Sequence, residues 1–362
     1  MERMSSARDR YFMRNALNIS LRGIGNTHPN PSVGAVVVKN NQIISRGWTQ
    51  PGGAPHAEVR ALKKKNFSGA TLYTTLEPCS HYGKSPPCVD QIIKSKIKRV
   101  VIGLKDPNPK VNGKGINKLR KKKIKISVGI LQNEIKKIHS SFFHKIKNKR
   151  PFVSSKIAIS SNGKMINENK KWITSKDSRM YGNFLRAKFD AVITGINTVM
   201  EDNPLLNCRH PNMENLSPAR FILDSKLKIK ETFKIVKTAK NIKTYVFTNT
   251  NNKKKILKLK KYGIIIKCLD QNEERINLRK VLSEIAEMGF INVLLEAGPN
   301  LNIAFLKCNL INKIYYFKSN EIVKSSTIIS EKMLSTKNIQ SLKFKLSSYR
   351  NIGNDTLRIY EK

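Results

Sequence analysis

The sequence has 362 residues, 39% of them hydrophobic, and a mean hydropathy of −0.42. This composition supports two domain cores, and no run approaches the roughly 18 unbroken apolar residues of a spanning helix, which excludes a membrane protein. The formal net charge is +44 at pH 7. Both halves are basic and lysine far outnumbers arginine, so the charge indicates codon bias, and we expect no specific nucleic-acid partner and no membrane partner.

The first half of the chain alternates predicted helices with predicted strands. Helices are expected over 9–23, 56–65 and 86–96, and strands over 33–38, 71–76 and 99–103. A turn at Asn40-Asn41 makes the first strand part of a hairpin. This alternation predicts an α/β layered domain, which we place at residues 1–148.

A polar run without periodicity, residues 145–151, marks the domain boundary. The second domain, residues 151–362, is predicted to be α/β as well. Its strands are expected at 152–159, 191–194, 221–223, 244–248 and 293–296, and its helices at 175–188 and 301–308. The lysine-rich run 253–261 is expected to be a solvated helix face.

The five cysteines indicate a reducing compartment. Their number is odd, their spacing is wide, and the N-terminus has no apolar signal segment. We therefore expect a cytoplasmic protein without a disulfide framework.

Three residues of the first half form a metal-ligand set. His56, Cys79 and Cys88 supply one imidazole and two thiolates, and a fourth position left to water is typical of a catalytic zinc site. Zinc lowers the pKa of that water and supplies a hydroxide nucleophile. Glu58, two residues after the histidine, is the expected proton shuttle from the water to the leaving amine. The pattern resembles that of the zinc nucleobase deaminases.

The spacing of the two cysteines, nine positions, departs from the usual P-C-x-x-C pattern. The loop that begins Thr75-Leu76-Glu77-Pro78-Cys79-Ser80-His81 resembles one family closely. Further matches are His28–Gly34, Asp106–Pro109 and Val111–Gly115. The family is that of the bifunctional riboflavin-biosynthesis proteins, in which diaminohydroxyphosphoribosylaminopyrimidine deaminase is joined to 5-amino-6-(5-phosphoribosylamino)uracil reductase.

This resemblance implies a cytidine-deaminase-like α/β/α layered N-terminal domain and a dihydrofolate-reductase-like α/β C-terminal domain. In the first domain it implies substrate contacts from Asn30, His81 and Lys84, with Lys84 facing the phosphate. The family often has a histidine where this chain has Thr49, so one substrate contact is expected to be lost or replaced.

The resemblance also implies an NADPH site in the second domain, which has no G-x-G-x-x-G fingerprint. A glycine turn before the 301–308 helix suits a pyrophosphate, because free backbone N–H groups face it. The implied cofactor residues are Ala158, Trp172, Thr198, Asp202, Ser225, Gly298, Pro299, Asn300, Leu301, Asn302, Ile303 and Ala304.

The implied substrate residues of the second domain include two arginines suited to a ribose phosphate. They are Lys156, Lys170, Arg186, Leu206, Arg209 and Glu296. Three departures from the family occur here. Asn162 replaces an aspartate, Lys170 replaces a serine, and the family's Ala-Pro-x-Leu-Leu-Gly segment is not recognisable in 316–325.

The sequence therefore predicts a zinc- and NADPH-dependent enzyme of riboflavin biosynthesis acting on a small phosphorylated pyrimidine, expected to be a homo-oligomer. One alternative is an active deaminase with a degenerate, non-catalytic reductase domain. Others are a nucleic-acid base deaminase, which the cysteine spacing disfavours, and a zinc-stabilised binding module, in which Glu58 would have no purpose.

Overall fold

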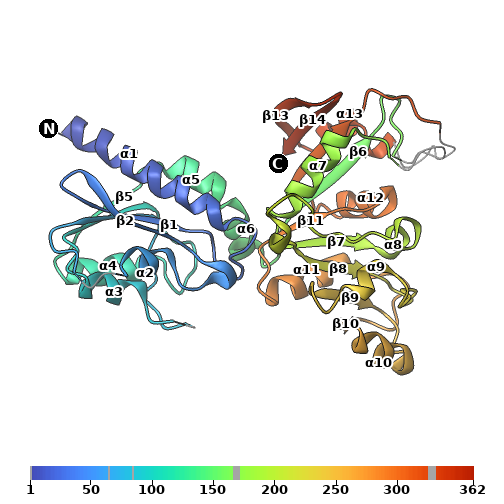
Figure 1. Ribbon diagram of the computed structural model, residues 1–362, viewed down its shortest axis with the longest axis horizontal. Coiled ribbons are helices and arrows are strands. Elements are labelled where there is room, and N and C mark those ends of the chain that lie inside the picture. The colour runs from blue at the N-terminus through green and yellow to red at the C-terminus, as the bar shows by residue number, and fades with distance from the viewer. Residues whose placement is uncertain (1, 64–65, 84, 166–171, 325–331) are drawn as a thin grey trace. The chain divides into compact units, whose positions relative to one another are not determined.

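The computed structural model describes residues 2–63, 66–83, 85–165, 172–324 and 332–362 (Figure 1). The chain divides into two compact units, residues 1–150 and 151–362. Within the described residues, no helix is both long enough and apolar enough to span a bilayer.

The first unit is built on a five-stranded sheet with the strand order β2-β1-β3-β4-β5. Its strands are β1 (Gly34–Lys39), β2 (Gln42–Trp48), β3 (Thr71–Leu76), β4 (Arg99–Leu104) and β5 (Lys125–Val128). Strand β1 runs antiparallel to both β2 and β3, whereas β3, β4 and β5 are parallel. The carboxyl ends of β3 and β4 therefore lie at one edge of the sheet.

Helices cover both faces of this sheet (Figure 1). They are α1 (Glu2–Ser20), α2 (Ala57–Ala61), α3 (Cys88–Lys94), α4 (Lys114–Lys121), α5 (Gln132–Ile138) and α6 (Ser140–Asn148). Helices α1 and α5 share one face, since a side chain on Gly103 of β4 would meet both Met13 and Ile135. Helices α2, α3 and α4 lie on the other face, which completes the predicted α/β/α layers.

The second unit has a nine-stranded sheet with the order β10-β9-β8-β7-β11-β6-β12-β14-β13. Its strands are β6 (Phe152–Ile159), β7 (Ala191–Gly195), β8 (Ala219–Leu223), β9 (Thr244–Thr248), β10 (Ile264–Cys268), β11 (Asn292–Leu295), β12 (Lys313–Lys318), β13 (Lys345–Ile352) and β14 (Asp355–Glu361). The first seven strands in this order are mutually parallel, and β14 and β13 add an antiparallel edge.

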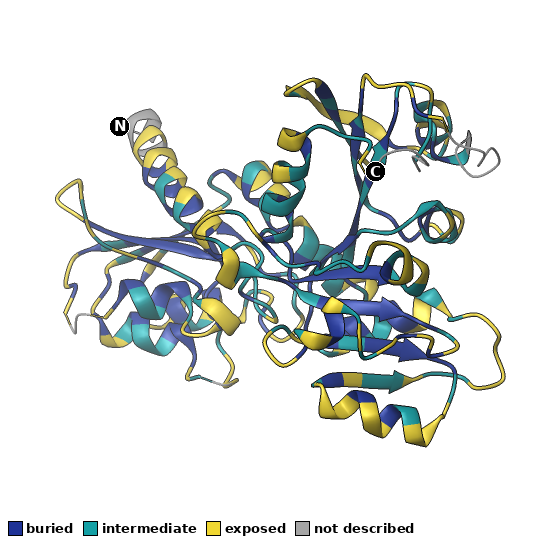
Figure 2. Cartoon of the chain, turned by 45° about the vertical axis from the view of Figure 1, so that its right-hand side comes forward, coloured by how far each residue is buried: buried dark blue, intermediate teal, exposed yellow. Residues whose placement is uncertain are grey.

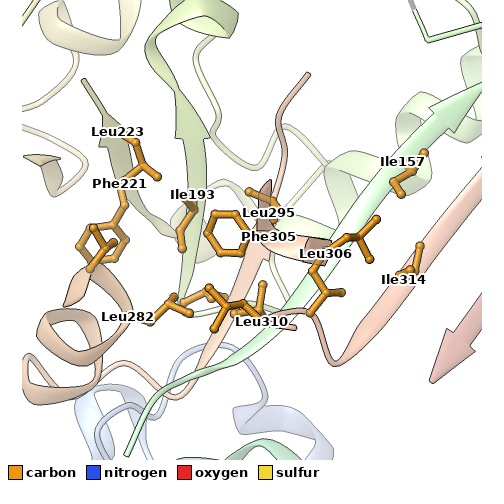
Figure 3. Packing of buried hydrophobic residues seen from close by; sticks show 14 of the residues in the cluster. Ile157, Ile193, Phe221, Leu223, Leu282, Leu295, Phe305, Leu306, Leu310 and Ile314 are labelled. Carbon is orange, nitrogen blue, oxygen red and sulfur yellow. The ribbon is translucent and has the colours of Figure 1, made fainter. Parts of the chain in front are cut away.

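Residues of alternate register point to opposite faces of this sheet, as the period of two requires. Ile193, Phe221 and Leu295 pack on one face with helices α11 and α12, as Figure 3 shows for part of the cluster. Val192 and Ile222 pack on the other face with α7, α9 and α10. The helices of this unit are α7 (Lys176–Arg186), α8 (Ile196–Asp202), α9 (Lys234–Lys237), α10 (Lys253–Lys261), α11 (Leu278–Glu287), α12 (Pro299–Lys307) and α13 (Thr336–Ser341).

Two details refine the predicted elements. Helix α10 buries Ile256 and Leu259 and exposes most of its lysines, which confirms the solvated face (Figure 2). The helix expected over 56–65 is shorter in the described residues, because α2 ends at Ala61 and the chain then turns to bury Leu62 and Phe67.

Candidate active sites

The three predicted zinc ligands converge at one edge of the first sheet. His56 is the N-cap of α2, Cys88 is the first residue of α3, and Cys79 follows β3. Their ligand atoms all lie within 4.8 Å of one another. His56 Nδ1 is 3.2 Å from Cys88 Sγ and 3.6 Å from Cys79 Sγ. One imidazole nitrogen and two sulfurs in this arrangement fit a zinc ion with an open fourth position.

Electrostatics favour a thiolate at Cys79. A hydrogen bond with the Cys88 thiol, followed in strength by one with His56, lowers the pKa of Cys79 to about 4 against the opposing effect of burial. The backbone N–H of Cys88, at the start of α3, also donates to Cys79 Sγ over 3.3 Å. A thiolate at a helix N-terminus is the form that binds a metal.

Glu58 lies beside the ligand set, in the first turn of α2. Its side chain is 4% exposed and its Oε1 accepts a hydrogen bond of 3.1 Å from the Thr74 hydroxyl. Burial raises the pKa of this carboxyl above its ordinary value, although His56 opposes the shift. A raised carboxyl pKa suits a group that both accepts and returns a proton near neutral pH.

The expected substrate contacts of this unit differ in their surroundings. Asn30 Nδ2 donates to the Gly53 carbonyl over 2.9 Å and lies 3.2 Å from His56 Nε2, so Asn30 borders the metal site. His81 is exposed in the loop between the cysteines, and Lys84 lies outside the described residues. Thr49 is buried and its hydroxyl accepts from the Val33 N–H, so this departure from the family serves the fold.

Sequence reasoning missed the role of Glu77. Its carboxylate accepts three backbone hydrogen bonds, from the N–H groups of Asp106, Gly113 and Ile116. These groups belong to the segment 106–116, which contains two of the family motifs. Burial raises the pKa of Asp106 to about 6. The glycine-rich pattern in this segment was the available signal, since a side chain on Gly115 would come within 2.2 Å of the Pro78 carbonyl oxygen.

The second unit gathers charged residues at its expected substrate site. Arg186 and Glu296 form a two-pronged ion pair, with Nε–Oε1 2.6 Å and Nη2–Oε2 2.9 Å. Lys156 and Arg209 lie close enough to interact electrostatically with this pair, and Asp202 interacts with Lys156. Burial lowers the pKa of Lys156, and the Glu296 carboxylate opposes that shift.

The edge of the Arg186 guanidinium formed by Nε and Nη2 is bonded to Glu296. Arg209 Nη1 donates to Asn207 Oδ1 over 3.1 Å. The expected contacts of the two arginines with a phosphate stay predictions. Leu206 is 3% exposed and Lys170 lies outside the described residues.

The turn between β11 and α12 offers a place for a pyrophosphate. Gly298 is the N-cap of α12, and a side chain there would meet nothing nearer than Thr198 Oγ1 at 4.0 Å. The Gly298 N–H donates to that same hydroxyl over 3.3 Å. The open cradle and the free N–H groups of α12 fit the diphosphate of NADPH.

The other expected cofactor residues divide into groups by burial. Asn302 is fully buried, accepts from Ser155 and donates to the Ala297 and Gly298 carbonyls, so it shapes the turn from inside. Asn300 is exposed, and Ala158, Pro299, Leu301, Ile303 and Ala304 are half-buried. Trp172 is 53% exposed and lies under the Arg179 guanidinium.

Ser225 lies at the carboxyl ends of β8, β9 and β10. There it lines a groove of about 370 Å³ together with Lys226, Asn249 and Gln271. Ligands of parallel α/β sheets bind at this edge. The groove lies at the same edge as the start of α12, which follows β11 of the same sheet.

The Asn162 departure has a structural explanation. Its Oδ1 accepts from the Val323 N–H over 3.2 Å and its Nδ2 donates to the Val323 carbonyl over 3.0 Å. An aspartate could accept the first bond but could not donate the second. The amide therefore ties the 160–163 turn to the segment 321–323.

Each unit matches a known protein family. The family "RibD C-terminal domain" matches residues 151–358, and the family "Cytidine and deoxycytidylate deaminase zinc-binding region" matches residues 6–104. Riboflavin biosynthesis protein RibD of Aquifex aeolicus is 38% identical over 359 residues, covering 98% of each chain. The Escherichia coli protein of the same name is 30% identical over 366 residues, covering 96% of this chain and 97% of its own.

Solved structures agree over the full length. RibD of Acinetobacter baumannii has a TM-score of 0.87 at 32% identity, covering 98% of this chain and 99% of that chain. A Thermotoga maritima structure, described as a diaminohydroxyphosphoribosylaminopyrimidine deaminase/5-amino-6-(5-phosphoribosylamino)uracil reductase, has a TM-score of 0.85 at 32% identity and covers 99% of both chains. The expected fold class and the resemblance drawn from the motifs are confirmed, and this chain belongs to the family of riboflavin biosynthesis protein RibD.

Proposed function

We propose that this chain catalyses two successive steps of riboflavin biosynthesis. The first unit deaminates 2,5-diamino-6-(5-phosphoribosylamino)pyrimidin-4-one by hydrolysis. The second unit then reduces the ribosyl chain to ribityl with hydride from NADPH. Membership of the RibD family supports the pair of activities, and the convergence of His56, Cys79 and Cys88 beside Glu58 is the observation that carries the first of them.

The deamination depends on proton transfer by Glu58. His56, Cys79 and Cys88 would hold the zinc, which would supply a water of lowered pKa. The Glu58 carboxylate would accept a proton from the attacking water and return it to the amine that leaves as ammonia. Its burial and its raised pKa support this role, since the proton must be held between the two transfers. Asn30, beside His56, orients the pyrimidine.

The reduction depends on charge placed around the ribose. NADPH, when bound along the start of α12, supplies the hydride. We assign the accompanying proton to Lys156 Nζ, because burial lowers the pKa of this lysine and favours proton release. The Glu296 carboxylate, which is hydrogen-bonded to Arg186, interacts electrostatically with Lys156 and balances its charge. Arg209 binds the substrate phosphate.

The proposal also covers the compartment, the oligomeric state and the partners of the enzyme. All five cysteines are free, which supports a reducing cytoplasm. Strand β13 is a sheet edge with Leu346 and Tyr349 exposed, which supports a homo-oligomer and is checked by light scattering on the purified chain. The proposal includes no specific nucleic-acid partner.

A coupled assay tests the proposed function. The full chain is supplied with the diamino substrate, with and without NADPH, while ammonia release and NADPH oxidation are followed separately. We expect ammonia in both cases and NADPH oxidation only after deamination. Ammonia without oxidation, even with deaminated substrate, would favour the alternative of a degenerate reductase unit.

A further inference from the structure

Arg220 is a buried arginine without a carboxylate partner among the described residues. It lies in β8 and its relative exposure is 0%. All five of its N–H groups have acceptors, but these are the Thr238 and Thr244 hydroxyls and the Leu205 and Ile242 carbonyls. Even with every donor satisfied, a buried guanidinium without a carboxylate partner carries a desolvation cost, and apolar residues of similar volume often give a more stable core. Stability of the core alone therefore does not account for a guanidinium here.

One of these bonds reaches a segment that the proposed reduction uses. Arg220 Nη1 donates to the Leu205 carbonyl over 2.9 Å. Leu205 belongs to the segment 203–209, which connects α8 to Arg209 and includes Leu206. The other four bonds of Arg220 stay within β9 and the chain just before it.

The segment needs such tethers because its backbone is strained. Asn203 and Leu206 have φ values of 42° and 50°, in the left-handed region that non-glycine residues rarely adopt. Conformations of this kind persist only where the surroundings fix them. Arg186 supplies a second tether from the substrate side, with Nη1 donating to the Asn207 carbonyl over 3.0 Å. The two arginines thus hold the carbonyls on either side of Leu206.

We propose that Arg220 is a positioning residue of the reductase site, which fixes the 203–209 segment through the Leu205 carbonyl so that Leu206 and Arg209 meet the substrate. This inference rests on the proposed reduction, because that reaction gives Leu206 and Arg209 their roles. Arg220 itself does not touch the substrate.

The test compares three variants of the full chain. Arg220→Met removes the tether, and Arg220→Lys keeps the charge and a donor. Thr244→Val is the matched control, since it removes two bonds to the same guanidinium and leaves the Leu205 contact in place. Each variant is measured for thermal unfolding, for the Kd of 5-amino-6-(5-phosphoribosylamino)uracil by calorimetry, for the Kd of NADPH, and for amide hydrogen exchange over residues 203–209.

We expect Arg220→Met to weaken substrate binding by about tenfold to a hundredfold, since misplacing the groups that contact a substrate by about 1 Å can cause a loss of this size. NADPH binding should stay unchanged, exchange in 203–209 should accelerate, and Arg220→Lys should restore part of the substrate affinity. Thr244→Val should lower the unfolding temperature without changing either the substrate Kd or the exchange.

Equal effects of Arg220→Met and Thr244→Val on substrate affinity and on exchange would overturn the inference and leave a purely structural role. If the unmodified chain binds no substrate, the proposed reduction fails instead. The exchange measurement still decides in that case whether Arg220 holds the segment.

Discussion

Glu58 owes its chemistry to its surroundings more than to its identity. It is buried in the first turn of α2, and burial raises its pKa although the nearby His56 and the Thr74 hydroxyl both favour the charged carboxylate. The carboxylate of Glu77, two residues before the Cys79 ligand, accepts hydrogen bonds from three backbone N–H groups. Of these two buried glutamates, one suits the proton transfer that we propose and the other anchors the backbone of the segment 106–116.

Replacing Glu58 with glutamine should separate proton transfer from metal binding. The amide keeps the shape of the side chain but cannot carry the proton, so we expect deamination to fall by about 10²–10⁴-fold. Zinc content should stay at about one ion per chain, because Glu58 is not one of the three ligands. Ammonia release and metal analysis check the two parts, with Thr74→Val as a control that keeps the carboxylate. Loss of zinc from Glu58→Gln would contradict the assignment.

At the scale of elements, the segment 106–116 is docked onto the metal-binding strand end by its backbone. Gly115 packs tightly there, because the Pro78 carbonyl leaves no room for a side chain. The sequence motifs in this segment are thus explained by packing as well as by any contact with substrate.

Gly115→Ala should disrupt the metal site. A Cβ atom at 2.2 Å from the Pro78 oxygen would force the backbone next to Cys79 to shift. We expect lower zinc occupancy and lower deaminase activity, with reduction of deaminated substrate retained. Gly182→Ala, in helix α7, is the control: nothing lies within 4 Å of the added carbon, and the helix should be stabilised by about 0.5–1 kcal/mol. Full zinc content in Gly115→Ala would show that the segment moves freely.

The junction of α5 and α6 contains a histidine that should make stability depend on pH. His139 is 3% exposed and its Nε2 has no hydrogen-bond partner among the described residues. Burial lowers the pKa of His139 from 6.5 to about 4. The unfolded chain therefore takes up a proton that the folded chain excludes, and the free energy of unfolding should fall as the pH drops from about 6.5 to about 4.

The size of this effect is about 3 kcal/mol, from about 1.4 kcal/mol per unit of pKa shift. His139→Leu should flatten the dependence of stability on pH in this window, as measured by urea unfolding of the full chain. The comparison at pH 8, where the histidine is neutral in both states, isolates the packing contribution of the substitution. An unchanged slope between pH 6.5 and 4 would show that the ring is reached by solvent.

At the scale of the whole molecule, the residues that we assign to each site lie within one compact unit. The zinc ligands and Glu58 lie in residues 1–150, and the charged cluster of Lys156, Arg186 and Glu296 lies in residues 151–362. The two activities should therefore be separable within the intact chain.

Cys79→Ser should abolish zinc binding and ammonia release but leave NADPH oxidation with deaminated substrate intact. Arg209→Ala should leave zinc binding and ammonia release intact and impair the reduction. It should raise the KM for deaminated substrate by about tenfold to a hundredfold, which corresponds to the loss of a charge-assisted hydrogen bond to a phosphate. Parallel assays of ammonia and of nicotinamide absorbance check both variants. A loss of both activities in either variant would show that the two sites depend on each other.

The sequence by itself was enough to predict the His56, Cys79 and Cys88 cluster and the layered character of both units, and it suggested Glu58 as the proton shuttle that we propose. Short motifs suffice for this, because His56, Glu58, Cys79 and Cys88 are chemically distinctive and close in sequence, and apolar periodicity fixes helices and strands locally. The sequence did not single out β13 and β14, because β13 is exposed along nearly all its length and so shows little alternation of apolar and polar residues.

Only the tertiary structure decided which charges meet. Arg186 and Glu296 are 110 positions apart, and the sequence alone did not indicate that they form an ion pair. Arg220, Glu77 and Asn162 likewise gain their roles from backbone groups of distant or neighbouring segments. Backbone carbonyls and N–H groups are the same in every residue, so no sequence pattern marks the ones that a buried side chain will reach.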